Sequence, residues 1–154
     1  MKHIDDKVLS VSAIKEGTVI DHIPSNSLFD VLNILKLDNI STQMTFGSNF
    51  PSKVLGRKAI IKIEGKFFEP DEINRIALVA PQAKLNIIHN YNVMEKHVVD
   101  IPDKIVGIAK CMNPKCITNY ESVVTKFTVV DKTNVALKCH YCEKITDRRN
   151  LMLY

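Results

Sequence analysis

All four cysteines of the chain lie in its last third, as two close pairs, and their spacing constrains the fold more than any other feature. Cys111 and Cys116 form a Cys-x4-Cys pair, Cys139 and Cys142 form a Cys-x2-Cys pair, and 22 residues separate the two pairs. Two such turns, brought together by a hairpin, supply the tetrahedral set of soft thiolates that zinc prefers. Because all four ligands are thiols, we expect a closed, structural site for one Zn²⁺ that does not activate water.

Two disulfide bonds are the alternative use of these cysteines, and such bonds form in oxidising compartments. The N-terminal segment Met-Lys-His-Ile-Asp-Asp lacks the charged start and the apolar stretch of an export signal. We therefore expect reduced thiols and a cytoplasmic protein. No apolar run approaches the length of a membrane span, so we expect no membrane contact.

The formal net charge of +4 arises entirely in residues 101–154, which hold nine basic and five acidic residues, whereas residues 1–100 hold twelve of each. Four thiolates and one zinc ion together carry a charge of about −2. Four lysines flank the cysteines and offset that charge: Lys110, Lys115, Lys138 and Lys144. The basic excess thus has a local explanation, and binding to nucleic acid is not required.

Two other functional classes remain as alternatives at this point. A zinc ribbon that binds nucleic acid would use a basic surface with aromatic residues, and Tyr120, Phe127 and Tyr141 are candidates. An autonomous enzyme is the other class, but no serine, histidine and acid cluster follows from the spacing, and zinc would occupy every thiol. We therefore assign no catalytic residue and expect a binding or regulatory protein.

A proline-interrupted connector at Val98–Asp103 divides the chain into a domain of residues 1–100 and a domain of residues 101–154. The hydrophobic pattern predicts strands at 8–14 and 18–23, a helix after Pro24, strands at 43–48 and 58–63, a helix from Pro70, and a strand at 84–88 that continues through 91–94. This βαββαβ order is the ferredoxin-like arrangement, an antiparallel sheet with both helices on one face. The predicted class is α+β, followed by a small all-β zinc-binding domain, since about 50 residues form too small a core without a metal.

Side chains alternate along a strand, which assigns the residues of the first domain to two faces of the sheet. In the strand Lys58–Ile63, the side chains of Lys58, Ile60 and Lys62 share one face. Two ammonium groups beside one aliphatic residue suit a ligand that is flat and apolar at one end and anionic at the other. The ordinary alternative is a solvated strand face.

The same alternation assigns residues of the neighbouring strands to faces of the sheet. Asn86 and Ile88 share a face, and so do Val19 and Asp21, whereas strict alternation turns His22 the opposite way or into the loop at Pro24. The chain contains neither a P-loop nor a G-x-G-x-x-G motif, so no recognised phosphate motif identifies a nucleotide directly.

Several blocks along the chain match, in order, one known family. They are Ala13–Lys15, Gly17–Pro24, Gly56–Lys58, Ile61–Glu64, Ala80–Ala83, Asn90–Tyr91, Ala136–Cys139 and Tyr141–Lys144. Through these blocks the chain resembles, over essentially its whole length, the regulatory chain of aspartate carbamoyltransferase. The resemblance implies a chain without activity of its own, which acts in pyrimidine biosynthesis.

The resemblance also implies effectors and partners. In this family the first domain binds nucleoside triphosphates, with CTP inhibiting and ATP activating, and UTP with Mg²⁺ as a further effector. The zinc domain contacts the catalytic chain. Regulatory chains form homodimers through their first domains and, with catalytic trimers, build a dodecamer of six catalytic and six regulatory chains.

The family's nucleotide pocket corresponds to Val11, Ser12, Ala13, Ile14, Val19, Asp21, His22, Lys58, Ile60, Lys62, Asn86, Ile88, Tyr91, Val93 and Lys96. By this resemblance, backbone groups near residues 12–14, 88 and 91 recognise the base. Asp21 and Lys62 hold the ribose, and Lys96 with His22 or Lys58 holds the phosphates.

The resemblance places Asn113 and Glu143 at the interface with the catalytic chain. The chain departs from the family nearby. Lys115 stands where a second Asn is familiar, and the loop before Asn134 is shorter and less basic.

Overall fold

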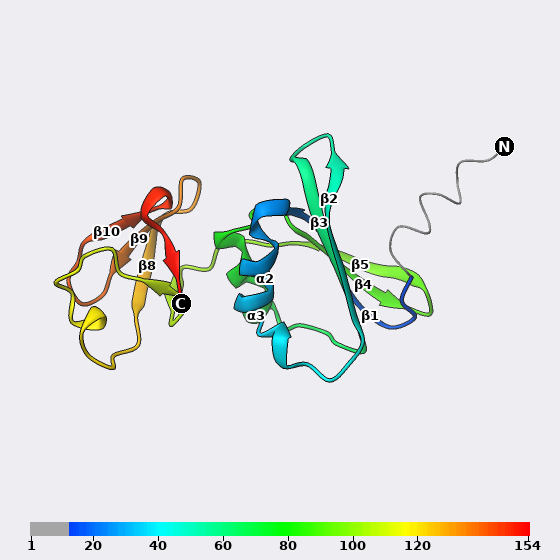
Figure 1. Cartoon of the computed structure of the whole chain (residues 1–154), viewed down its shortest axis with the longest axis horizontal. Helices are drawn as coiled ribbons and strands as arrows, with labels where there is room; N and C mark the ends of the chain where they lie inside the picture. Colours follow the sequence, from blue (N-terminus) through cyan, green and yellow to red (C-terminus); the bar gives the residue numbers. More distant parts are fainter. Residues whose placement is uncertain (1–12) are drawn as a thin grey trace. The chain divides into compact units, whose positions relative to one another are not determined.

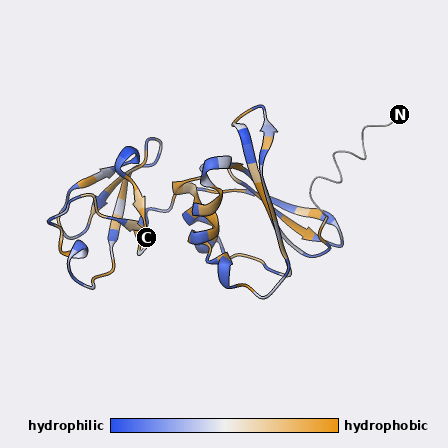
Figure 2. Cartoon of the chain, viewed as in Figure 1, coloured by the Kyte–Doolittle hydropathy of each residue, from blue (hydrophilic) through white to orange (hydrophobic). Residues whose placement is uncertain are grey.

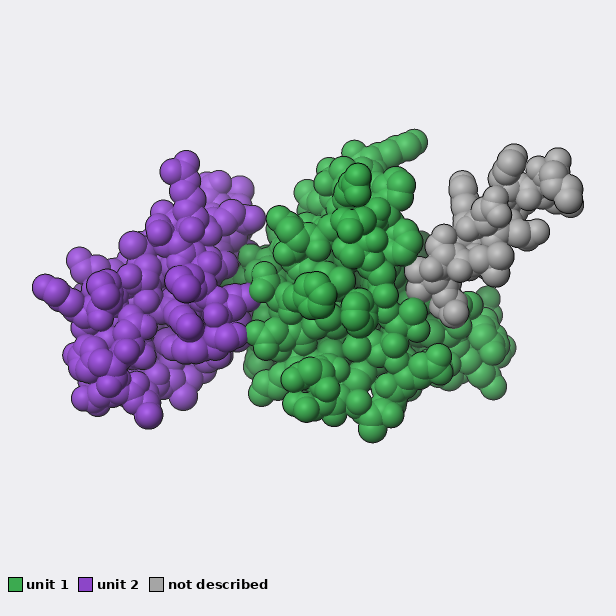
Figure 3. Space-filling view, viewed as in Figure 1, with its two compact units in different colours: residues 1–100 green, residues 101–154 purple. Residues whose placement is uncertain are grey.

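The computed structural model describes residues 13–154 and divides the chain into two compact units, residues 1–100 and residues 101–154 (Figure 1; Figure 3). Each unit has a sheet of its own. The predicted strand at 8–14 falls largely on residues that lie outside the described part of the chain, as do the predicted pocket residues Val11 and Ser12.

The first unit is a five-stranded antiparallel sheet in the order β2-β3-β1-β4-β5, with both α-helices on one face (Figure 1). In chain order its elements are β1 (Gly17–Pro24), a 3-10 turn (Ser25–Ser27), α2 (Leu28–Ile34), a 3-10 turn (Leu37–Asn39), β2 (Met44–Ser52), β3 (Gly56–Glu64), α3 (Pro70–Asn74), a 3-10 turn (Arg75–Leu78), β4 (Lys84–His89) and β5 (Asn92–Val98). The first four strands have the ferredoxin-like order, and β5 extends the sheet beyond β4. The predicted fold class is confirmed.

The core of the first unit lies between the sheet and the helices, because one face of each strand is apolar. On β3, Ala59, Ile61 and Ile63 are fully buried, and on β1 Ile20 and Ile23 are fully buried as well. In Figure 2 the hydrophobic colour runs along the central strands and appears on parts of both helices, which also carry hydrophilic segments. Among residues 13–154, no helix covers the opposite face of the sheet.

Both helices are short, for local reasons. Pro70 begins α3, and Glu69 and Glu72 form a capping box that satisfies the first free amides. Helix α2 ends before Lys36, whose left-handed backbone (φ 55°) stops the helix. Among residues 13–154, no helix has the length and apolarity needed to cross a bilayer.

A β-bulge interrupts the pairing of β1 with β3 between Ile20 and Ile23. Both of these isoleucines face the helices, so the two residues between them, Asp21 and His22, both face the open side, opposite Ile60. His22 has φ 60°, the left-handed conformation that such a bulge accommodates. The prediction that His22 faces away from Asp21 was therefore wrong, because the extra residue of the bulge shifts the alternation of side chains along β1 by one.

The second unit consists of a four-stranded antiparallel sheet in the order β10-β9-β8-β6 and a two-stranded ribbon of β11 and β7. Its elements are β6 (Lys104–Val106), β7 (Ala109–Lys110), a 3-10 turn (Ile117–Asn119), β8 (Lys126–Asp131), β9 (Ala136–Cys139), β10 (Ile145–Asp147), a 3-10 turn (Arg148–Asn150) and β11 (Met152–Leu153). Its largest fully buried side chains are Phe127, Ile105, Leu137 and Val135. So small a core is characteristic of a domain held together by a metal or by disulfides.

Gly17 begins β1 and lies against the end of β3, with no room for a side chain. Its φ of 138° disfavours other residues, and a Cβ atom would collide with the backbone carbonyl of Ile63. We expect Gly17→Ala to lower the free energy of unfolding by about 1–3 kcal/mol more than Gly56→Ala. Gly56 is the matched control, because it also has a positive φ (77°) but open space where its Cβ would lie. Equal thermal and urea midpoints for the two variants would contradict the close approach.

Candidate functional site

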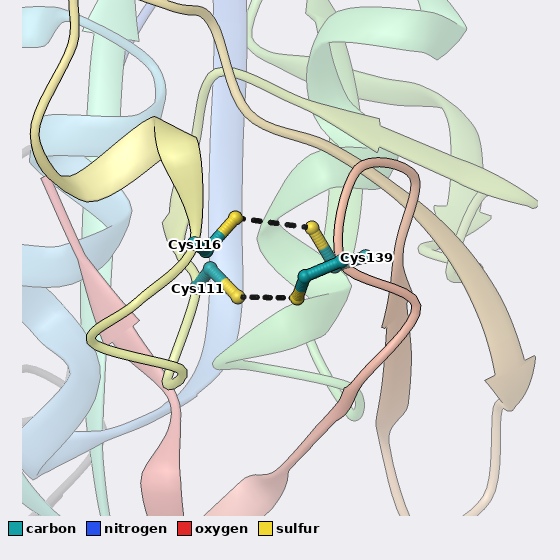
Figure 4. Close-up of side chains that lie close together, drawn as sticks. Cys111, Cys116 and Cys139 are labelled. Carbon is teal, nitrogen blue, oxygen red and sulfur yellow. Dashed lines mark hydrogen bonds between the residues drawn. The ribbon is translucent and has the colours of Figure 1, made fainter.

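Four cysteine side chains converge in the second unit. Cys111 follows β7, Cys116 begins the 3-10 turn at 117–119, Cys139 ends β9, and Cys142 lies in the turn before β10. Their Sγ atoms all lie within 4.8 Å of one another. Figure 4 shows the thiols of the two turns pointing toward one another, with Sγ–Sγ distances of 3.6 Å for Cys111–Cys142 and 3.7 Å for Cys116–Cys139.

These distances fit a tetrahedral metal and exclude disulfide bonds. Zn–S bonds of about 2.3 Å at tetrahedral angles place sulfur atoms about 3.8 Å apart. A disulfide requires about 2.05 Å, and all four cysteines are free. The four thiols therefore lie close enough together for one tetrahedral ion to bind all of them.

Neighbouring polar groups hold the thiols in this arrangement. The Thr118 hydroxyl donates to Cys116 Sγ over 3.2 Å. The Asn119 amide donates to the carbonyls of Cys111 (3.0 Å) and Asn113 (2.7 Å), which fixes the first turn. Such outer contacts orient the ligands of a metal and tune its affinity.

The thiols differ in acidity. Burial raises the pKa of the Cys111 thiol to about 12 and also raises the pKa of the Cys139 thiol. Burial raises the pKa of Cys142 too, but hydrogen bonds from the Asn113 side chain and the Lys144 backbone outweigh it and lower that pKa to about 7. The buried thiols are stable as neutral groups unless a cation replaces their protons, which couples metal binding to proton release.

The open face of the first unit carries the second group of side chains that the sequence analysis singled out as candidates. The strand register aligns Lys62 on β3, Val19 on β1, Asn86 on β4 and Lys96 on β5 in one row across the sheet. Adjacent strands are about 4.8 Å apart, so the backbone positions of the two lysines are about 14 Å from each other, with Val19 and Asn86 between them. As the alternation predicted, Lys58, Ile60 and Lys62 share this face and are half-buried.

The next part of this face contains an ion pair. Lys58 Nζ lies 3.0 and 3.2 Å from the two carboxylate oxygens of Asp21. His22 Nδ1 lies 3.6 Å from Asp21 Oδ2 and, as a buried ring nitrogen, has no hydrogen-bond partner among the described residues. Burial lowers the pKa of Lys62, and the charge of Asp21 opposes that shift. One carboxylate thus stands among several cationic groups that an anionic ligand could share.

A hollow of about 220 Å³ lies on this face, toward the turn between β4 and β5. It is lined by Ala13, Ile14, Val19, Lys62, Asn86, Ile88, Tyr91 and Val93. All eight belong to the residues that the resemblance assigned to the nucleotide pocket. Its walls are mostly apolar, with Lys62, Asn86 and the Tyr91 hydroxyl as polar groups, which is the usual composition of a small-molecule site.

Two charged residues of this region were missed by the sequence analysis. Lys84 on β4 lies opposite Asp21 on β1 in the strand register, so the two residues share a face of the sheet. Strict alternation from Asn86 could have placed Lys84 on this face. Glu16 binds the turn between β4 and β5, accepting from the Asn90 amide over 3.0 Å and contacting His89 Nδ1 over 2.7 Å. No local pattern could have revealed Glu16, since its partners are more than 70 residues away in sequence.

Comparison with known proteins decides the family. Residues 9–100 match the model of the aspartate carbamoyltransferase regulatory chain, allosteric domain, and residues 103–152 match the model of its metal binding domain. This chain belongs to the aspartate carbamoyltransferase regulatory chain family. The resemblance drawn from the sequence blocks is confirmed.

Curated regulatory chains match nearly the whole length. The regulatory chain of Bacteroides fragilis is 54% identical over 147 residues (96% of each chain). That of Pyrococcus horikoshii is 53% identical over 146 residues (94% of this chain, 96% of the relative), and that of Thermococcus sibiricus is 56% identical over 138 residues (90% and 91%). A zinc ribbon that binds nucleic acid is not favoured. The second unit is a metal-binding domain with four cysteines positioned to bind a metal.

The two residues expected at the interface of regulatory and catalytic chains lie in the two cysteine turns. Asn113 is half-buried, and its side-chain oxygen accepts from the Lys115 amide over 3.1 Å. Glu143 is exposed, and its backbone has φ 64° where the second turn reverses. A surface formed by these residues depends on both turns being held in place.

The hydroxyl of Thr118 provides a test of the metal centre that leaves all four cysteines intact. We expect Thr118→Val to weaken metal affinity roughly 10- to 100-fold, because the hydrogen bond to Cys116 Sγ is lost. Thr118→Ser keeps the hydroxyl and is the control. Competition with a chromogenic chelator measures the affinity. Equal affinities for both variants would show that this contact does not tune the site.

Proposed function

We propose that this chain is a non-catalytic regulatory subunit of aspartate carbamoyltransferase, with CTP as inhibitor and ATP as activator. Residues 1–100 are the domain that binds the nucleotide effector. Residues 101–154 are a zinc-binding domain that contacts the catalytic chain. Family membership supports this division of labour, and the side chains of the two units supply its chemistry.

The observation that carries the nucleotide assignment is the row of Lys62, Val19, Asn86 and Lys96 beside the 220 Å³ hollow. The hollow is smaller than the roughly 300–1,000 Å³ of sites that enclose a whole drug-sized ligand. It therefore takes the base and part of the ribose, with backbone groups near Ile14, Ile88 and Tyr91 recognising the base. Asn86 supplies an amide that can pair with a base edge.

The anionic end of the ligand extends out of the hollow along the open face. Asp21 and Lys62 hold the ribose, and Lys96 with Lys58 or His22 holds the phosphates. Lys58 is already paired with Asp21, so a triphosphate competes with that carboxylate for the ammonium group. Nδ1 of His22, which accepts or donates no hydrogen bond among residues 13–154, supports a further polar contact from the ligand. UTP with Mg²⁺ is a further effector in this proposal.

The second unit acts as the mechanical connection to the catalytic chain. One Zn²⁺ bound by the four cysteines holds both turns, and with them Asn113 and Glu143, in the geometry that the catalytic chain recognises. Zinc has this structural role because four thiolates leave no open coordination position. Without the ion the short strands lack an adequate core, so docking fails with folding.

Regulation follows from coupled equilibria in a cytoplasmic assembly of six catalytic and six regulatory chains. Regulatory chains pair as homodimers through the first unit. A triphosphate shifts the assembly between two states only by its differential affinity for them, a coupling of about 1–3 kcal/mol. ATP and CTP share the phosphate contacts, so the base determines the sign of the effect.

Replacing Lys62 tests the nucleotide site. We expect Lys62→Ala to weaken ATP and CTP binding roughly 10- to 100-fold, because a charged hydrogen-bond donor is lost. Lys53→Ala, which removes an exposed lysine from the turn between β2 and β3, is the control and binds like wild type. Calorimetry on the isolated regulatory chain measures both. Unchanged affinity in Lys62→Ala would refute the site.

Assembly tests the role of the second unit. We expect Asn113→Ala and Glu143→Ala to retain one metal ion per chain but to bind the aspartate carbamoyltransferase catalytic chain more weakly, because contacts at the interface are lost while the fold remains. Metal removal abolishes assembly altogether. Co-sedimentation with the catalytic chain, with metal content measured on the same samples, distinguishes these cases. A metal-free chain that still assembles would contradict the proposal.

A further inference from the structure

The turn between β4 and β5 carries Tyr91 to the edge of the hollow, and a residue outside the nucleotide set holds this turn. We propose that Glu16 is a positioning residue of the nucleotide site, whose carboxylate fixes the turn, and with it Tyr91 and Val93, against the start of β1. This inference rests on the proposed nucleotide function of the hollow.

The turn requires support because its backbone is unfavourable. Asn90 and Tyr91 both have left-handed conformations, with φ of 49° and 65°. A two-residue hairpin turn with two positive φ values favours Asn and Gly at these positions, and an aromatic residue pays a conformational cost there. The Tyr91 side chain is 64% exposed, so few side-chain contacts offset that cost. Contacts to the backbone must therefore hold the turn.

Glu16 and its neighbour supply those contacts. Glu16 Oε1 accepts from the Asn90 amide over 3.0 Å, Glu16 Oε2 lies 2.7 Å from His89 Nδ1, and the Lys15 carbonyl accepts from the Tyr91 amide over 3.0 Å. Hydrogen bonds to an ionised acceptor are stronger than neutral ones. The hydrogen bond from the Asn90 amide lowers the pKa of Glu16, and the contact with His89 lowers it further. The turn thus favours the carboxylate form of Glu16.

The other side of Glu16 is anchored to the rigid part of the sheet. Its carbonyl accepts from the Gly65 amide, just after β3, over 2.9 Å. His89 is held in turn by stacking on Phe67, with ring centroids 5.3 Å apart and planes at 20°. Residue 16 thus joins the end of β3, the start of β1 and the turn between β4 and β5.

This connection sets the width of the hollow. Ala13 and Ile14, which immediately precede Lys15 and Glu16, line the hollow together with Tyr91 in the turn and Val93 just after it. Glu16 fixes these two groups of lining residues relative to each other. Its loss should therefore weaken contacts to the base and ribose and leave the contacts of the lysines with the phosphates unchanged.

The experiment compares the full-length wild-type chain with Glu16→Ala, Glu16→Gln and Lys96→Ala, using ATP, CTP and the uncharged nucleosides adenosine and cytidine as probes. We expect Glu16→Ala to weaken triphosphate and nucleoside binding by the same factor, roughly 3- to 10-fold, with an unchanged dependence on salt. Glu16→Gln restores much of the affinity, because its amide oxygen still accepts from the Asn90 amide. Lys96→Ala weakens only the triphosphates and reduces the salt dependence.

Hydrogen exchange at the Asn90 and Tyr91 amides, measured beside the thermal midpoint, separates positioning from general folding. Faster exchange at these two amides in Glu16→Ala, with an unchanged midpoint, supports the proposal. Two results would overturn the proposal. One is a lowered thermal midpoint in Glu16→Ala, with faster exchange throughout the first unit and no recovery of affinity in Glu16→Gln. The other is wild-type affinity in Glu16→Ala. If Lys62→Ala loses affinity while Glu16→Ala does not, only this inference fails. If the wild-type chain binds none of the probes, the proposed function fails as well.

Discussion

The second unit depends on the convergence of four thiol groups from two separate turns. Its strands are two to six residues long, and its small core has four large, fully buried side chains. The Cys111–Cys116 turn and the Cys139–Cys142 turn are far apart in sequence, and together they bring four sulfur atoms within 4.8 Å of one another, close enough for one tetrahedral ion to bind them all. Contacts from Thr118 and Asn119 orient the first turn, so the outer polar groups and the thiols form one arrangement. A metal in this site joins the two cysteine turns, which the small apolar core of the unit holds together only weakly.

The first unit uses a different principle, since its buried core and its proposed nucleotide site lie on opposite faces of one sheet. Both helices cover one face, and the isoleucines of β1 and β3 fill the space beneath them. The other face is left for lysines, an amide and a small hollow. Because opposed residues of neighbouring strands share a face, the register alone aligns Lys62, Val19, Asn86 and Lys96. The core that stabilises the sheet thereby also positions the residues of the proposed nucleotide site.

The regular features of both units could be predicted from the sequence. Cysteine spacing indicated the metal centre because ligands within short turns are local, and alternation placed Lys58 and Lys62 on the open face. Features that depend on long-range pairing could not be predicted. The bulge that turns His22 to the open face follows from the register of β1 against β3, and the contacts of Glu16 join residues 73 and 74 positions apart. The separate strand β5 was read as an extension of β4, because Asn90-Tyr91 lacks the glycine that usually marks such a turn.

The tetrathiolate metal centre is the central claim, and X-ray absorption at the metal edge of the purified chain tests it most directly. The account predicts zinc at one ion per chain, surrounded by four sulfur atoms at about 2.3 Å and no lighter ligand. A first coordination shell that contains nitrogen or oxygen would contradict it. So would a folded chain without zinc in which the cysteines are oxidised in pairs.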